Sequence, residues 1–147
     1  MGKILAVCIS EHKGTVKKPI NCGCIIEDFG LKGDAHAGKW HRQISLLDAD
    51  AVQRFEDKYH IAVKPGAFGE NLLTKGINLK HLPVGTLLKS GDVLLEITQI
   101  GKKCHLGCNI QQQTGECIMP HEGVFAKVVH GGVVRADDDI EIAEVHL

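Results

Sequence analysis

The sequence has few aromatic residues and almost no excess charge. Phenylalanine, tryptophan and tyrosine make up 4% of its 147 residues, and only one of them is a tryptophan. Proteins that bind single-stranded nucleic acid stack its bases on aromatic side chains, so this scarcity argues against such a partner. The formal net charge of −1 gives no bulk positive field that would attract nucleic acid or an anionic membrane. We therefore expect no nucleic-acid partner.

Long hydrophobic runs and an export signal are also missing. No apolar stretch is long enough to cross a bilayer, so we expect no membrane association. The apolar run that follows Met1 is short, is flanked by one lysine and lacks a small-residue cleavage site. It predicts a first strand rather than a signal peptide, and we expect a cytoplasmic protein. In that compartment six cysteines are more often reduced thiols, metal ligands or catalytic groups than disulfides.

Short runs rich in β-branched residues, separated by turn residues, fill most of the chain. The length suits a single domain, 1–147, and the polar segment 11–19 is expected to be a loop. The strand-like runs are 3–10, 21–28, 43–47, 83–89, 92–100, 123–129 and 140–147. One helix is expected to run to about Tyr59, capped by Asp48 or Asp50. The sequence predicts a mainly β domain with one or two short helices, and closing the sheet into a barrel would remove its edges.

The segment 101–132 is polar and rich in glycine, yet it contains half of the cysteines: Cys104, Cys108 and Cys117. Cys104 stands between two lysines and a histidine, namely Lys102, Lys103 and His105. Thiols react as thiolates, and neighbouring cations favour the thiolate. Cys104 is therefore the leading candidate for a reactive thiol. The alternative is an inert Cys104 shielded inside the fold.

The other three cysteines carry weaker signals. Cys8 lies inside an apolar run and is expected to be a buried structural thiol. Cys22 and Cys24 form a Cys-Gly-Cys pair that could chelate a soft metal. A tetrahedral site needs four ligands, so we favour the simpler interpretation, the start of a strand that contains a glycine.

A second informative stretch, 29–42, contains three glycines and is expected to be a loop. It gathers polar and charged side chains: Asp34, His36, Lys39, His41 and Arg42. Lysine, histidine and arginine together suit an anionic ligand, because the guanidinium offers a planar fork to phosphate. Two alternatives stay open. The histidines could bind a metal, or Asp34 could merely tie down the loop by accepting hydrogen bonds from backbone amides.

Four long segments carry a resemblance to a known family. They are GDAHAGKWHRQISLLD, FGENLLTKGI, LPVGTLLKSGDVLLEITQIGKKCH and CIMPHEGVFAKVVHGG. The chain resembles a stand-alone MOSC domain from about residue 21 to its end. The family is named for the C-terminal domain of molybdenum-cofactor sulfurases. The resemblance implies a strand-rich, barrel-like fold with few helices, in agreement with the pattern of the residues.

The resemblance also implies a function. A family cysteine handles sulfur or contacts molybdenum, and Cys104 matches its position best, with Cys117 as the second candidate. Two departures from the family pattern are His121, where an arginine is expected, and the run Asp137 to Asp139, which replaces a Gly-Asp turn. We expect no pyridoxal-phosphate domain, which is the part of full-length sulfurases that mobilises sulfur from cysteine. Sulfur mobilisation would therefore need a partner, either a cysteine desulfurase or sulfurtransferase or another protein of molybdenum-cofactor biosynthesis.

These observations give three hypotheses. In the first, Cys104 takes a sulfane sulfur as a persulfide or binds molybdenum. Cys108 or Cys117 then resolves the persulfide as a disulfide. The basic residues of the loop 29–42 hold the phosphate of the pterin cofactor. Whether this amounts to an enzyme is left open. In the second, the domain only binds the molybdenum cofactor or a biosynthesis partner. In the third, which we expect least, Cys104, His105, Cys108 and Cys117 hold a stabilising zinc ion. The oligomeric state is left open.

Overall fold

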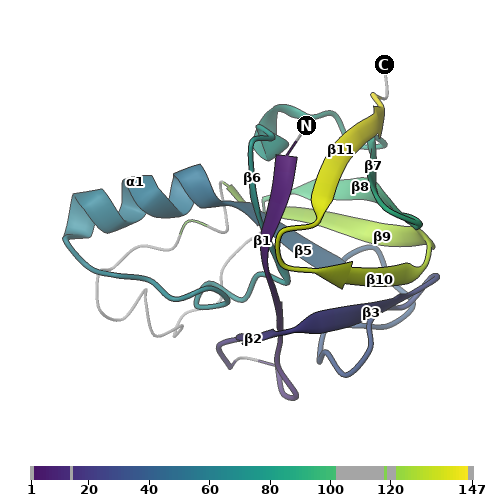
Figure 1. The fold of residues 1–147 in the computed structure, drawn as a ribbon, viewed down its shortest axis with the longest axis horizontal. Helices are drawn as coiled ribbons and strands as arrows, with labels where there is room; N and C mark the ends of the chain where they lie inside the picture. Colours follow the sequence, from purple (N-terminus) through teal and green to yellow (C-terminus); the bar gives the residue numbers. More distant parts are fainter. Residues whose placement is uncertain (1, 14, 102–117, 119–121, 146–147) are drawn as a thin grey trace.

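The computed structural model describes residues 2–13, 15–101, 118 and 122–145, and strands dominate it (Figure 1). The strands are β1 (Gly2–Ile9), β2 (Lys18–Ile20), β3 (Cys22–Ile26), β4 (Gly30–Leu31), β5 (Ile44–Asp48), β6 (Leu72–Lys75), β7 (Leu87–Ser90), β8 (Val93–Ile100), β9 (Val124–His130), β10 (Gly132–Arg135) and β11 (Asp139–Glu144). The described helices are α1 (Ala49–Tyr59) and the 3-10 turn η1 (Leu79–His81).

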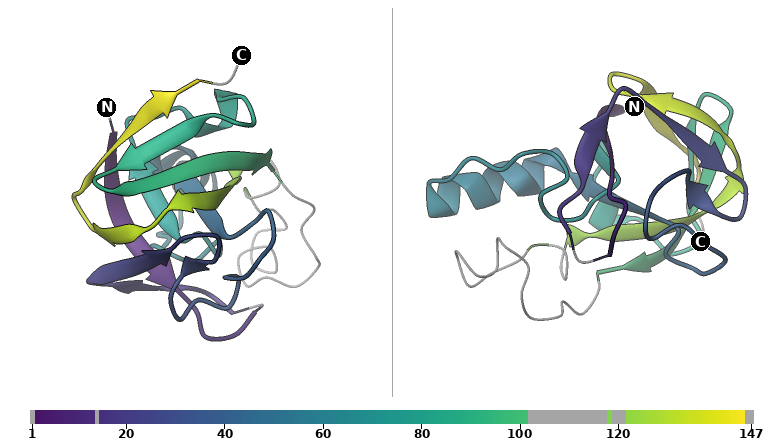
Figure 2. Two further views of the ribbon diagram at one scale, coloured as in Figure 1. Left: turned by 90° about the vertical axis from the view of Figure 1, so that its right-hand side faces the viewer. Right: turned by 90° about the horizontal axis from the view of Figure 1, so that it is seen from below.

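The main sheet closes on itself. Its strand order is β11-β7-β8-β9-β5-β6-β1-β2. An additional β11–β1 pairing closes the strands from β11 to β1 into a ring, which Figure 2 shows end-on in its right-hand view, while β2 pairs with the end of β1 outside this ring. The β5–β6 pair is parallel, whereas the other pairs are antiparallel. A small sheet of order β10-β3-β4 accompanies the barrel. Because β1 pairs with β11, the first strand of the chain is hydrogen-bonded to the last.

Helix α1 makes the crossover between the parallel strands β5 and β6 and lies outside the barrel (Figure 1). Asp48 begins it by accepting a hydrogen bond from the backbone amide of Asp50, and His60 ends it in the left-handed conformation. Its buried side chains are Ala51, Val52 and Phe55. Phe55 meets Phe68 edge to face with 5.1 Å between ring centroids, an arrangement that aromatic pairs prefer.

Two apolar clusters result, one inside the barrel and one beneath α1. Strand β1 contributes to both: Ile4 and Val7 face the barrel interior, whereas Ala6 and Cys8 pack under the helix. The register of β1 against β6 shifts between Ile4 and Ala6. Such a bulge reverses the alternation of a strand, which explains how one strand serves both clusters.

The predicted fold class is confirmed, and Asp48 is the helix cap that the structure selects. Several boundaries were wrong. The strand expected over 83–89 begins only at Leu87, and the strand expected over 140–147 ends at Glu144. The loop expected over 11–19 ends early, because β2 begins at Lys18 and Lys17 is buried. The loop expected over 29–42 contains the two-residue strand β4. None of the helices in the described part of the chain is long and apolar enough to span a membrane.

Candidate functional site

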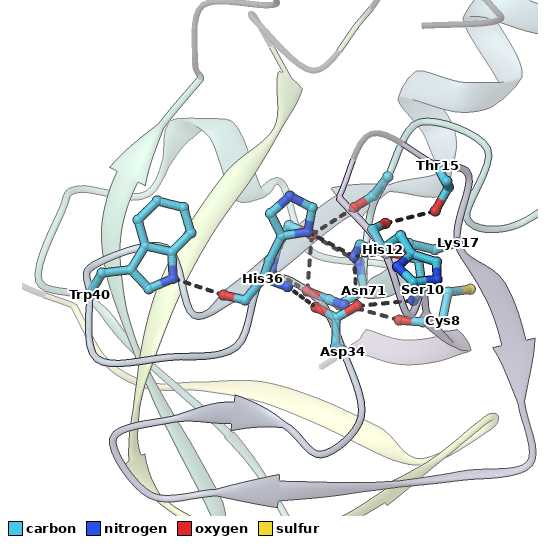
Figure 3. A network of polar contacts seen from close by, with 11 residues as sticks. Cys8, Ser10, His12, Thr15, Lys17, Asp34, His36, Trp40 and Asn71 are labelled. Atoms are coloured by element: carbon cyan, nitrogen blue, oxygen red, sulfur yellow. Dashed lines mark hydrogen bonds and ion pairs between the residues drawn. The ribbon is translucent and has the colours of Figure 1, made fainter.

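A buried ion pair lies where the loop 32–43 meets β1. The Nζ atom of Lys17 lies 2.6 Å from Oδ1 of Asp34, and both side chains are at most 1% exposed. Ser10 joins them, because its hydroxyl lies 3.2 Å from Lys17 Nζ and its backbone amide donates to Asp34. Figure 3 shows these side chains converging with that of His36. We call Ser10, Lys17, Asp34 and His36 the loop base.

The position of Lys17 depends on a glycine from a distant part of the chain. The backbone amide of Lys17 donates to the carbonyl of Gly66. A Cβ atom at Gly66 would lie 2.2 Å from the carbonyl oxygen of Lys17, and Gly66 has a positive φ of 88°. Only glycine meets both demands. The Pro65-Gly66 turn therefore fixes the place at which Lys17 enters the interior.

Lys17 also determines the tautomer of His36. Lys17 Nζ lies 3.0 Å from Nδ1 of His36. An ammonium group has no acceptor, so Nδ1 must accept this hydrogen bond and the ring proton of a neutral imidazole must sit on Nε2. The backbone amide of His36 in turn donates to Oδ2 of Asp34. The loop base thus fixes the orientation of the His36 ring.

Charge compensation decides the ionisation of Asp34. Burial alone would raise the pKa of its carboxyl, but the hydrogen bond and charge of Lys17 outweigh that cost and the pKa is lowered. Asn71 also bonds to Asp34, and its amide ties β1 to β5 through Cys8 and Ser45. The ion pair is therefore tied into the hydrogen bonds that join neighbouring strands of the barrel.

Glu70 is a second buried carboxyl close to the loop base. It accepts hydrogen bonds from the backbone amides of Gly66 and Phe68. Burial raises the pKa of Glu70, and these amides together with the charge of Lys17 only partly oppose that effect. Nearby, burial and the charge of Glu70 raise the pKa of Cys8 to about 12. Cys8 is therefore a protonated structural thiol, as the sequence predicts.

The far end of the loop, residues 39–42, is more exposed, and we call it the loop tip. The guanidinium carbon of Arg42 lies 4.6 Å from the centre of the Trp40 ring and 5.7 Å from that of Phe125. Lys13 also lies over the Trp40 ring, at 5.8 Å. The Nε atom of Arg42 is buried and has no hydrogen-bond partner within the described residues. The loop tip therefore presents cations supported by one indole ring.

Strand β8 anchors the loop tip. The hydroxyl of Thr98 donates to the carbonyl of His41, and the ring Nε2 of His41 lies 2.8 Å from Oε1 of Gln99. The amide nitrogen of Gln99 donates to the carbonyl of Gly101, which fixes its orientation. The indole Nε1 of Trp40 donates to the carbonyl of His36 and links the tip to the base (Figure 3). The tip is thus held at the end of β8.

The predicted anion-binding residues fall into two groups. Asp34 and His36 belong to the loop base, whereas Lys39, His41 and Arg42 belong to the loop tip, where Lys39 is exposed. Asp34 accepts the backbone amides of Ser10 and His36, which is the alternative role considered for it, and it accepts Lys17 as well. Among the residues that the structure describes, no group of three or more His, Cys, Asp or Glu side chains could hold a metal ion.

Several predicted residues lie outside the described residues. They are Lys102, Lys103, Cys104, His105, Cys108, Cys117 and His121. Cys22 and Cys24 are described and are free and exposed, at the start of β3 as the favoured interpretation predicts. Asp137 and Asp138 lie in the turn between β10 and β11, in which Asp137 takes a positive φ, and Asp139 is the first residue of β11.

Sequence reasoning missed three residues of the site: Ser10, Lys17 and Asn71. Lys17 looked like one more cation in a polar loop, and no local pattern indicates that it is buried. Asn71 carries a usable signal, because it follows Glu70 within the otherwise apolar run 67–73. Polar residues in such a run are expected to be buried and hydrogen-bonded, as both are here.

The sequence and the fold both match known proteins. The MOSC domain family matches residues 33–141, and the chain belongs to this family. Protein YiiM of Escherichia coli is 25% identical over 96% of this chain and 68% of its own length. The crystal structure of the YuaD protein from Bacillus subtilis superposes with a TM-score of 0.79 at 19% identity, covering 95% of this chain and 94% of YuaD. The crystal structure of YiiM from Geobacillus stearothermophilus superposes with a TM-score of 0.74 at 18% identity, covering 98% of this chain and 76% of that YiiM.

Proposed function

We propose that this protein binds a molybdenum–pterin cofactor through the anionic end of that cofactor, and that Cys104 handles sulfur or contacts molybdenum beside it. The single observation that supports the binding site most strongly is Arg42. Its guanidinium is stacked against Trp40 and Phe125, and its Nε donor is buried without an acceptor within the described residues. A stacked guanidinium is preorganised, so it loses little freedom when it grips a phosphate.

The sign of the charge at the loop supports an anionic ligand. Lys17 neutralises Asp34 inside the loop base. The remaining formal charges of the loop tip are those of Lys39 and Arg42, with Lys13 on the same indole ring. Cations in a partly desolvated setting attract phosphate more strongly than solvated surface lysines do. The net charge of the whole chain, −1, does not supply this attraction, so it is local.

The described donors fit one end of such a cofactor. Arginine and lysine match a phosphate, whereas molybdenum requires a soft ligand such as a thiolate. Cys8 cannot serve, because burial holds its thiol protonated. Cys104 follows Gly101 by three residues in the sequence, and Gly101 accepts a hydrogen bond from Gln99, which also contacts the loop tip. The bound cofactor would supply the metal to which the thiolate binds.

Sulfur handling can be written as a balanced exchange. The Cys104 thiolate attacks the outer sulfur of a donor persulfide, the S–S bond of the donor breaks, and the donor leaves as a thiolate. Cys104 then carries the persulfide, and no external oxidant is needed. The donor is a partner cysteine desulfurase or sulfurtransferase. If Cys104 takes up no sulfur, the protein is a binding module for the cofactor without this chemistry.

The test compares the wild type with Cys104→Ser and Arg42→Gln. Each protein is incubated with a low-molecular-weight persulfide and, separately, with molybdenum cofactor. Intact mass reports sulfur uptake, and molybdenum and pterin retained through gel filtration report binding. We expect Cys104→Ser to lose sulfur uptake and Arg42→Gln to lose cofactor retention while keeping sulfur uptake.

Two other results would change the proposal. Cofactor retention by the wild type without any gain of sulfur favours the binding module. Retention that is unchanged in Arg42→Gln would move the anion site away from the loop tip. Analysis of the purified protein for zinc and molybdenum addresses the remaining hypothesis of a stabilising zinc ion.

A further inference from the structure

Cys22 and Cys24 lie on the same, exposed face of β3. Both thiols are free and exposed, and the residues between and after them, Gly23 and Ile25, are buried. Cysteine is among the residue types most often buried, so two exposed thiols on one strand need a reason other than core packing. Neither thiol is used by the proposed cofactor site.

The strand cannot turn these thiols inward. A Cβ atom at Gly23 would lie 2.6 Å from Cδ2 of Leu31 and 2.9 Å from Cγ1 of Val7. A side chain at this position would force the buried side chains of Leu31 and Val7 to shift. A shift of one residue would bring a cysteine into that space, so the register of β3 is fixed. Both thiols are therefore held on the solvent side.

The strand β10 supplies the neighbours of the two thiols. In the antiparallel pairing Cys24 is opposite Val133 and Cys22 is opposite Arg135. Residues directly opposite share a face, and Ile26 follows on the same face of β3. On the other side of β3, the backbone amide of Lys32 donates to the carbonyl of Cys24, so this exposed lysine flanks Cys24 as well. The dithiol thus has apolar side chains and Lys32 beside Cys24, and Arg135 beside Cys22. Apolar neighbours and sulfur donors disfavour hard, strongly hydrated cations, which prefer oxygen ligands.

The spacing selects a metal bridge over a disulfide. Residues i and i+2 of a strand are about 6.7 Å apart, near the upper limit for the Cα atoms of a disulfide. A metal between two thiolates needs the sulfurs only within roughly 4.6 Å of each other, at about 2.3 Å per metal–sulfur bond. Rotation about the two Cα–Cβ bonds can provide that separation. Zinc would need two more ligands, and the flanking Ile26, Lys32, Val133 and Arg135 include no His, Cys, Asp or Glu.

We infer that Cys22 and Cys24 form a two-coordinate site for a soft monovalent cation of the Cu(I) class. Binding replaces the two thiol protons: one Cu(I) and two thiols give a bis-thiolate complex of charge −1 and two released protons, with no change of oxidation state. Arg135, which lies opposite Cys22 on the neighbouring strand β10, has a guanidinium that partly neutralises this negative charge. This site is separate from the proposed cofactor site.

The experiment uses a background in which Cys104, Cys108 and Cys117 are replaced by serine, so that Cys8, Cys22 and Cys24 remain. Cu(I) is supplied without oxygen and competed with the chromophoric chelator bathocuproine disulfonate. We expect one Cu(I) per chain in this background. Adding Cys22→Ser or Cys24→Ser should weaken binding by at least about 100-fold, because chelation by a second linked ligand is lost. The buried Cys8 is present in every variant.

Competition with Zn(II) and native mass spectrometry of the copper complex provide two further tests. Zn(II) should not compete for the site at equal concentration, and the complex should have the mass of one chain with one copper. Equal Cu(I) affinity with and without the Cys22/Cys24 pair would overturn the inference, as would a copper ion shared between two chains. Because both residues are exposed, thermal melting of the serine variants should match that of the background. Loss of the cofactor function in this background would leave the result unaffected, so the two proposals fail separately.

Discussion

The two ends of the loop between β4 and β5 are built from similar residue types but differ in environment. At the base, Lys17 and Asp34 are both buried and neutralise each other. At the tip, Lys39 is exposed and Arg42 is only half-buried, stacked on Trp40. The charges of a buried ion pair neutralise each other, so the pair offers no net charge to a ligand. A cation that stacks on an aromatic ring without a carboxylate partner still offers its charge. The comparison supports a stabilising role for the base and agrees with the binding role proposed for the tip.

Removing one partner of the buried pair should have the largest effect. In Lys17→Met the carboxylate of Asp34 keeps its burial but loses its counter-charge. Breaking a buried pair costs about 3–5 kcal/mol, and we expect the free energy of unfolding to fall by that order. Urea denaturation measures it. Lys18→Met is the matched control, because Lys18 is the next residue and is exposed. Equal losses in both variants would show that the pair is not the cause.

Acidification should weaken the base through Asp34. The folded pKa of Asp34 lies below the unfolded value of about 3.9. Its contribution to stability is therefore fully present above that value and is lost as the pH falls through the folded pKa. We expect the stability difference between the wild type and Asp34→Asn to be constant from pH 7 to about pH 5 and to shrink towards pH 3.

Glu70 provides the contrast for this measurement. Burial raises the pKa of Glu70, so its protonation in the folded state favours folding at low pH and opposes the trend from Asp34. Because Glu70 is present in both proteins, its contribution cancels in the difference in free energy of unfolding between the wild type and Asp34→Asn. A difference that stays constant down to pH 3 would contradict the lowered pKa of Asp34.

At the tip, charge removal should affect binding and leave the fold intact. Arg42→Gln removes the stacked cation, and a hydrogen bond to a charged group contributes about 1.5–3 kcal/mol. We expect affinity for a phosphate-bearing pterin to fall by about 10- to 100-fold, with little change in melting temperature. Trp40 is the only tryptophan of the chain, so its fluorescence reports binding at the tip. Arg54→Gln on α1 removes the same charge at an exposed position and should bind normally.

The sequence predicted the tip better than the base, for a physical reason. Lys39, His41 and Arg42 are adjacent in the chain, so local composition shows a cationic loop. The base joins Ser10, Lys17 and Asp34 from three segments, and the burial of Lys17 depends on Gly66 far along the chain. The alternation of apolar and polar residues predicted most of the barrel strands, because this pattern is contained within each strand. The bulge of β1 and the small sheet of β10, β3 and β4 depend on pairing between distant residues, which alternation does not encode.

The smallest expected effect concerns Trp40, which joins the two ends of the loop. Its indole N–H donates to the carbonyl of His36 in the base, and its ring stacks on Arg42 in the tip. Trp40→Phe keeps an aromatic face and loses the hydrogen bond, while Trp40→Leu loses both. Each interaction is worth about 0.5–1 kcal/mol, so we expect Trp40→Phe to lower stability by about that amount with near-normal pterin affinity, and Trp40→Leu to weaken binding a further few-fold. Urea denaturation measures the stability of both variants, and calorimetric titration measures their pterin affinity, because the tryptophan fluorophore is gone. If Trp40→Phe weakened binding as much as Trp40→Leu, the hydrogen bond to the base would control the tip, and the two ends of the loop would act as one unit.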